Sequence, residues 1–82
     1  MTITSVLDDL DFIKELIYEL VDDKGKDQNH YEKIRDYVMR YMGPDAYAIY
    51  ENAVNCDGGT YWIDDKTTVE KIWKRMIHVK TT

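Results

Sequence analysis

The sequence predicts a mainly α-helical fold, a small bundle of about four helices, on three observations. Apolar residues recur at three- and four-residue steps along most of the chain, as in helices that bury one face. Glycines and the only proline stand between these stretches, where helices end and begin. The sequence has 82 residues, enough for a single domain, and the short connections favour antiparallel neighbours.

The first helix is expected over residues 6–23. Ser5 precedes the first apolar residue of the period and Gly25 follows the last, and these residue types commonly begin and end helices. The two faces of this helix differ, because one is apolar and the other is acidic. The apolar face consists of Val6, Leu10, Ile13, Ile17 and Leu20.

The second and third helices are expected over residues 30–42 and 44–56. Asn29 and Glu32 have the spacing of a variant capping box at the start of the second helix. Gly43 ends that helix, and the proline that follows suits the first turn of the next one, where its missing N–H needs no partner.

The fourth helix is expected over residues 68–78, since Thr67 and Glu70 form a capping box before a further apolar period. Its outer face is basic. An Asp-Gly-Gly turn and three large side chains precede it, and they favour a minor extended segment at 60–63. Its expected pairing partner is a second short extended segment at residues 78–80.

The predicted core joins the apolar faces of the four helices. Replacing Ile17 or Trp73 with alanine should cost a few kcal/mol, which threatens a domain of this size. The expected core members are Leu10, Ile13, Ile17, Leu20, Ile34, Val38, Tyr41, Ile49, Ala53, Ile72, Trp73 and Met76.

The formal net charge of −5 argues against general affinity for nucleic acid, because lysines and arginines supply that affinity by displacing counterions from phosphates. The charge is unevenly placed. Residues 1–28 hold eight acidic and three basic side chains, whereas residues 66–82 hold five basic and one acidic. This polarity allows a homo-oligomer in which the acidic first helix of one copy meets the basic fourth helix of another.

Five carboxylates of the first helix fall within roughly 80° of one another around its axis and extend over about 21 Å. Such aligned charges repel one another, so either they keep the chain soluble or a positively charged partner meets them. Tyrosine occurs seven times, and it is common at binding hot spots. The candidate partner-binding residues are Asp8, Asp11, Glu15, Glu19 and Asp22, together with Tyr37, Tyr41 and Tyr50.

The sequence offers no catalytic or metal-binding motif, and we expect no cofactor. His30, Cys56 and His78 lack the paired spacing of structural zinc sites. The glycines do not place carboxylates at the ligand positions of an EF-hand loop. A small enzyme that uses Cys56 with a histidine stays open as an alternative, because such residues need not be neighbours in sequence.

The protein is expected to be cytoplasmic. Its single cysteine cannot form an internal disulfide, and no Asn-X-Ser/Thr acceptor for glycosylation occurs. The first residues lack the basic start and the uninterrupted apolar run of a secretory signal. No apolar stretch reaches the length of a membrane span.

Together these features predict a non-enzymatic protein that binds another protein with a basic surface and modulates or inhibits it. An antagonist of a host protein, encoded by a phage or another mobile element, fits this composition. A second hypothesis is nucleic-acid mimicry, in which the row of carboxylates occupies a basic groove of a DNA- or RNA-handling protein.

Overall fold

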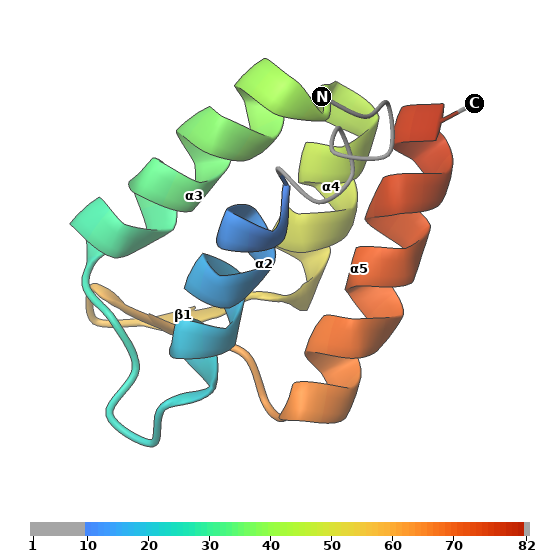
Figure 1. The fold of residues 1–82 in the computed structure, drawn as a ribbon. Coiled ribbons are helices and arrows are strands. Elements are labelled where there is room, and N and C mark those ends of the chain that lie inside the picture. The colour runs from blue at the N-terminus through green and yellow to red at the C-terminus, as the bar shows by residue number, and fades with distance from the viewer. Residues whose placement is uncertain (1–9, 82) are drawn as a thin grey trace.

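Four α-helices, a short 3-10 helix and a two-stranded hairpin follow one another in this computed structural model, which describes residues 10–81 (Figure 1). This confirms the predicted fold class, a mainly α-helical bundle with a minor extended segment. The elements are α2 (Asp11–Tyr18), η1 (Glu19–Val21), α3 (Gln28–Tyr41), α4 (Pro44–Ala53), β1 (Asn55–Asp57), β2 (Thr60–Trp62) and α5 (Lys66–Thr81).

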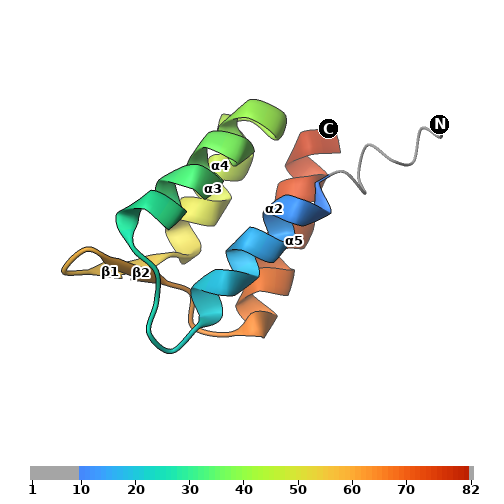
Figure 2. The same ribbon diagram turned by 60° about the vertical axis from the view of Figure 1, so that its left-hand side comes forward.

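The helices pack in a ring. α2 contacts α3 on one side and α5 on the other, and α4 closes the ring behind by contacting both α3 and α5 (Figure 1). The turned view in Figure 2 shows the pair α3 and α4 facing the pair α2 and α5. One face of α2 therefore points inward to the other three helices, and the opposite face points outward.

The first predicted helix differs from the observed one at its end. α2 stops at Tyr18, and the chain tightens into η1, which ends at Val21 instead of residue 23. The predicted start at residue 6, with its cap at Ser5, lies outside the described residues. Because the α-helical hydrogen bonds stop here, the carbonyl oxygen of Leu16 can form a hydrogen bond with the ring Nε2 of His30, 3.0 Å away.

Asp27 begins α3, where a capping box of Asn29 and Glu32 was predicted. The carboxylate of Asp27 accepts a hydrogen bond from the backbone N–H of His30 at 3.0 Å. The predicted capping box is wrong, because the carboxylate of Glu32 accepts instead from the side-chain amide of Gln28 at 2.7 Å. α3 consequently begins two residues earlier than expected.

Asp65 begins α5 in the same way. Its carboxylate accepts hydrogen bonds from the backbone N–H of Thr68 at 2.8 Å and from the Thr68 hydroxyl at 2.9 Å. The predicted box of Thr67 and Glu70 is wrong, because Glu70 forms an ion pair with Lys14 of α2 at 3.1 Å.

The extended segment pairs with a different stretch of chain from the one predicted. β1 and β2 form an antiparallel hairpin, with Cys56 opposite Tyr61, whereas residues 78–80 continue α5 as helix. The pairing with 78–80 is therefore wrong. Gly58 and Gly59 make the turn with φ of 60° and 85°, the left-handed region that two-residue hairpin turns require. Formation of β1 also ends α4 at Ala53, before the predicted residue 56.

The hairpin is attached to the bundle through the loop before α3. Lys26 and Tyr61 exchange backbone hydrogen bonds of 2.8 and 2.7 Å, and the N–H of Ile63 donates to the carbonyl of Leu20 at 2.9 Å. Gly25 has a φ of 70°, and a Cβ there would collide with the side chain of Thr60. Glycine is therefore required where the loop passes over β2.

Every helix contributes to one buried core. Of the predicted core members, Tyr41 is exposed, and Ile49 and Ala53 are only half-buried. α4 instead turns Ala46 and Tyr50 inward, which leaves Ile49 at the edge of its buried stripe. The buried side chains are Leu10, Ile13, Ile17, Leu20, Ile34, Val38, Met42, Ala46, Tyr50, Ile63, Val69, Ile72, Trp73 and Met76.

Candidate functional site

Three of the predicted carboxylates form a row on the outward face of α2 and η1. Asp11, Glu15 and Glu19 are all exposed and succeed one another at four-residue intervals. None of the three forms an ion pair or a side-chain hydrogen bond with another residue of the described chain. We call these three residues the acidic row. Their charges are available to a partner. Asp8, the first predicted member, lies outside the described residues.

Asp22 does not belong to the acidic row. It follows η1 with an extended backbone, and its carboxylate accepts from the backbone N–H of Lys24 at 2.9 Å and from Nζ of Lys26 at 3.4 Å. These contacts, the backbone hydrogen bond first, hold the pKa of Asp22 below its ordinary value. The chain's own loop thus already engages the charge that the sequence assigned to a partner.

An exposed aromatic cluster lies beside the acidic row, where α2 meets α3. The ring of Phe12 stands edge-on to Tyr37 and Tyr41, with centroid distances of 5.0 and 6.2 Å, and the two tyrosine rings stack at 6.2 Å. Phe12 is 42% exposed and Tyr41 is 44% exposed. Such rings in contact with water are unusual outside binding surfaces when they lie together.

Phe12 was missed by the sequence analysis. It falls about 120° from the centre of the buried stripe, between the apolar and the acidic faces of its helix. The sequence did contain one indication of its role, because an aromatic side chain outside the buried stripe of a helix is exposed to solvent unless a partner covers it.

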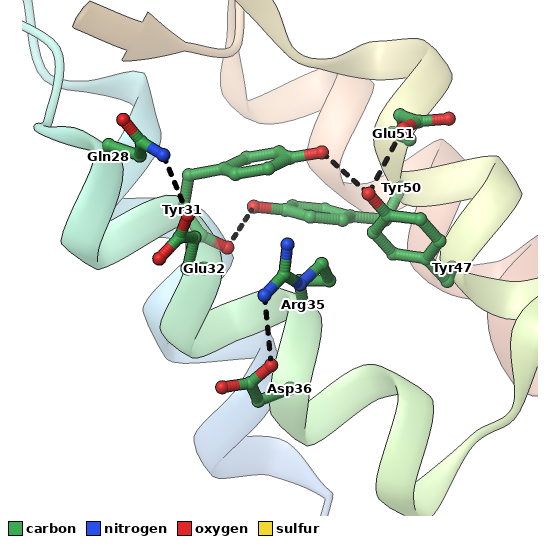
Figure 3. A network of polar contacts seen from close by, with 8 residues as sticks. All are labelled: Gln28, Tyr31, Glu32, Arg35, Asp36, Tyr47, Tyr50 and Glu51. Carbon is green, nitrogen blue, oxygen red and sulfur yellow. Dashed lines mark hydrogen bonds and ion pairs between the residues drawn. The ribbon is translucent and has the colours of Figure 1, made fainter. Parts of the chain in front are cut away.

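Tyr50 is not a surface residue, which corrects its assignment to a partner-binding site. Its side chain is 0% exposed. Figure 3 shows its ring lying beside that of Tyr31, and the centroids are 5.5 Å apart. The Tyr50 hydroxyl donates to the backbone carbonyl of Tyr31 at 3.4 Å. Tyr50 therefore joins α4 to α3 within the core.

The other tyrosines of this region form a structural network around Tyr50. The hydroxyls of Tyr31 and Tyr47 are 2.8 Å apart, and Tyr47 also donates to Glu51 at 3.0 Å (Figure 3). Tyr31 stacks on Tyr61 of β2 at 4.6 Å. Burial, followed by the hydrogen bonds with Tyr31 and Glu51, raises the pKa of Tyr47 far above its usual value. The Tyr47 phenol therefore stays protonated at neutral pH, and the network of hydroxyls and rings holds α3, α4 and β2 together.

The cysteine and histidine considered for catalysis have separate contacts. Cys56 is exposed on β1 and lies opposite Tyr61 across the hairpin, where the neighbouring thiol raises the pKa of the Tyr61 phenol. His30 lies on α3 and contacts the carbonyl of Leu16. Within residues 10–81, no group of three or more His, Cys, Asp or Glu side chains is placed to hold a metal ion.

No helix of the described chain has the length and apolar character needed to cross a bilayer. Comparison of the sequence and fold with protein-family models, curated proteins and solved structures found no match.

Proposed function

We propose that this chain is a small, non-enzymatic protein-binding module that modulates or inhibits a partner protein with a basic surface. The observation that carries the proposal is the acidic row, Asp11, Glu15 and Glu19, which is exposed and has no ion pair within residues 10–81, beside the cluster of Phe12 with Tyr37 and Tyr41.

The two parts of this surface would contribute differently to binding. Carboxylates at the rim of an interface steer a basic partner into place and exclude acidic ones, and they add mainly to the association rate. Aromatic side chains that become fully covered supply most of the affinity. Phe12, Tyr37 and Tyr41 are therefore the anchors, and the acidic row selects the partner.

The size and charge of the chain suit an antagonist. A compact cytoplasmic protein with one exposed binding face can inhibit an enzyme or a nucleic-acid-binding protein by covering its basic site. A phage or another mobile element would use such a protein against its host, and this is the setting that we propose.

Nucleic-acid mimicry is the weaker form of the proposal. Residues four positions apart in a helix are about 6 Å apart along its axis, whereas duplex DNA carries one charge per about 1.7 Å. The acidic row is therefore sparser than the phosphates that it would imitate. A partner whose binding to this chain is competed by DNA would favour mimicry.

A charge-reversal experiment tests the proposed function. The variant Glu15→Lys/Glu19→Lys should remain folded. When host lysate is passed over the immobilised proteins, this variant should lose partners that the wild type retains. Its affinity for an isolated partner should fall about tenfold or more. The control is Asp45→Lys/Asp57→Lys, which makes the same change of charge at two exposed residues on α4 and β1, outside α2 and η1.

Two results would contradict the proposal. One is equal retention of partners by the wild type and the charge-reversed variant. The other is equal loss of partners in both variants, because net charge alone would then explain the binding. Binding through the acidic row should also weaken as the salt concentration rises.

A further inference from the structure

The surface that carries the aromatic cluster bears charges of both signs. On α3, Lys33 and Arg40 lie within roughly 60° of Tyr37 around the helix axis, on the side away from the core. Both are exposed, and neither forms an ion pair within residues 10–81. They line a shallow hollow on the outer side of α3, together with Asn29, Glu32, Asp36 and Tyr37. Asp36 is engaged by Arg35 at 3.5 Å.

We call this surface the α2–α3 face. Across it, carboxylates lie on α2, aromatic rings lie along the boundary of the two helices, and cations lie on α3. The hydrogen bond of His30 to Leu16 and the contact of Tyr37 with Phe12 show that the two helices run antiparallel. In this register Glu15 is level with Lys33.

We propose that a second copy of the chain covers the α2–α3 face, with the two-fold axis running along the boundary between α2 and α3. Rotation about that axis places the acidic side of one copy on the basic side of the other, in both directions at once. Glu15 then meets Lys33 of the second copy, and the aromatic clusters meet at the centre. An axis across the helices would instead oppose carboxylate to carboxylate.

The basic face of α5 is a less suitable partner for the acidic row. In the head-to-tail oligomer considered from the sequence, the acidic row would meet the exposed basic residues of α5, which are Lys71, Lys74 and Arg75. The exposed large hydrophobic side chains of the described residues, however, are on α2 and α3 and none is on α5. Because covered apolar surface supplies most of the affinity between proteins, α2–α3 contact is favoured.

This inference rests on the surface used in the proposed function, and it adds that self-association and partner binding exclude each other. The free protein would protect its aromatic cluster by dimerising. A basic partner must then displace the second copy, so its apparent affinity should fall as the concentration of the chain rises.

Analytical ultracentrifugation of the full chain over about 10 μM to 1 mM, the range of weak protein contacts, tests the dimer. A reductant is included because the exposed Cys56 could otherwise link two copies. The wild type should show a reversible monomer–dimer equilibrium that Phe12→Ala removes. Met39→Ala is the matched control, since Met39 is 46% exposed but lies about 160° from Tyr41 around α3.

A charge swap tests the geometry of the contact. Glu15→Lys and Lys33→Glu should each raise the dissociation constant about tenfold, because symmetry turns two attractive pairs into repulsive ones. The double variant Glu15→Lys/Lys33→Glu keeps the wild-type net charge and should restore the dimer. A protein that is monomeric throughout, a dimer that survives Phe12→Ala, or a double variant that stays monomeric would overturn the inference.

The same double variant separates this inference from the proposed function. It should dimerise again and still fail to bind a basic partner, since the acidic row remains interrupted by lysine. If the wild type is monomeric but loses its partner on charge reversal, the dimer is wrong and the proposed function stands. If the dimer forms and charge reversal leaves partner binding intact, the proposed function is wrong and the dimer stands.

Discussion

Tyr50 places its ring in the core and its hydroxyl against the carbonyl of Tyr31, so a polar atom is buried with a partner (Figure 3). Tyr41, in contrast, is exposed within the aromatic cluster. The sequence offers little to separate these two residues, because both lie at helical spacing from apolar neighbours. Burial of Tyr50 depends on how α4 docks against α3, which is a property of the assembled bundle.

Removal of the Tyr50 hydroxyl should affect stability in a pH-dependent way. At neutral pH, Tyr50→Phe should cost about 0.5–1.5 kcal/mol, the usual worth of one neutral hydrogen bond. Burial, followed by the neighbouring Tyr31, raises the pKa of Tyr50 above its ordinary value of 10.0. Above pH 10 the unfolded chain therefore releases a proton that the folded chain keeps, and wild-type stability declines as the pH rises.

Urea unfolding at pH 7 and between about pH 9 and 11 checks this expectation. The stability of Tyr50→Phe should decline less steeply than that of the wild type in the alkaline range. Tyr41→Phe serves as the control at neutral pH, where removal of an exposed hydroxyl should change little. Identical alkaline profiles for Tyr50→Phe and the wild type would show that Tyr50 is not responsible.

Among the secondary-structure elements, the long helices were predictable and the hairpin was not. α3 and α5 repeat their apolar residues over several turns, so the period identifies them even though the predicted caps are wrong. The strands β1 and β2 have three residues each, which is too short for a period. The Gly58-Gly59 turn was visible, but it was not used to pair β2 with the adjacent β1, and the attachment of β2 to Lys26 depends on contacts distant in sequence.

The candidate site was also predictable only in part. The acidic row follows from helical spacing alone, because residues four apart share a face wherever the helix continues. Asp22 was assigned to that face wrongly because the helix tightens and ends before it. Phe12 could not be predicted as a candidate anchor, because the rings beside it, Tyr37 and Tyr41, come from α3.

At the scale of elements, the cap of α5 gives a testable expectation. Hydrogen bonds from Thr68, the backbone one first, hold the pKa of Asp65 below its ordinary value of 3.8. The stabilisation is therefore present above that value and is lost as the pH falls through the lowered pKa. Asp65→Ala should reduce the melting temperature at pH 7, because the first turn of α5 loses its cap.

Thermal unfolding followed by circular dichroism at pH 7 and at pH values below about 3 measures this effect. The difference between Asp65→Ala and the wild type should narrow in acid. Asp64→Ala is the matched control, since it removes the adjacent carboxylate, which accepts from the Asn55 amide at 2.9 Å but caps no helix. A gap between Asp65→Ala and the wild type that stays constant in acid would contradict the role of the carboxylate.

Considered as a whole, the molecule is held together by its core more than by its charges. The ion pair of Lys14 with Glu70 connects α2 to α5, but both side chains are partly exposed, and such pairs contribute little. The buried side chains instead come from every helix and form one cluster. Salt should consequently alter the binding of partners more than it alters the stability of the fold.

The structure also predicts which side chains hold the whole molecule together. Ile17 of α2 is completely buried, whereas Ile49 of α4 is half-buried, although the sequence placed both in the core. Ile17→Ala should cost about 2–5 kcal/mol, because it removes buried methyl groups and leaves a cavity. Ile49→Ala makes the identical chemical change and should cost clearly less, since solvent already reaches its side chain. Urea unfolding of the two variants measures the difference, and equal losses would show that the docking of α4 differs from the arrangement in Figure 1.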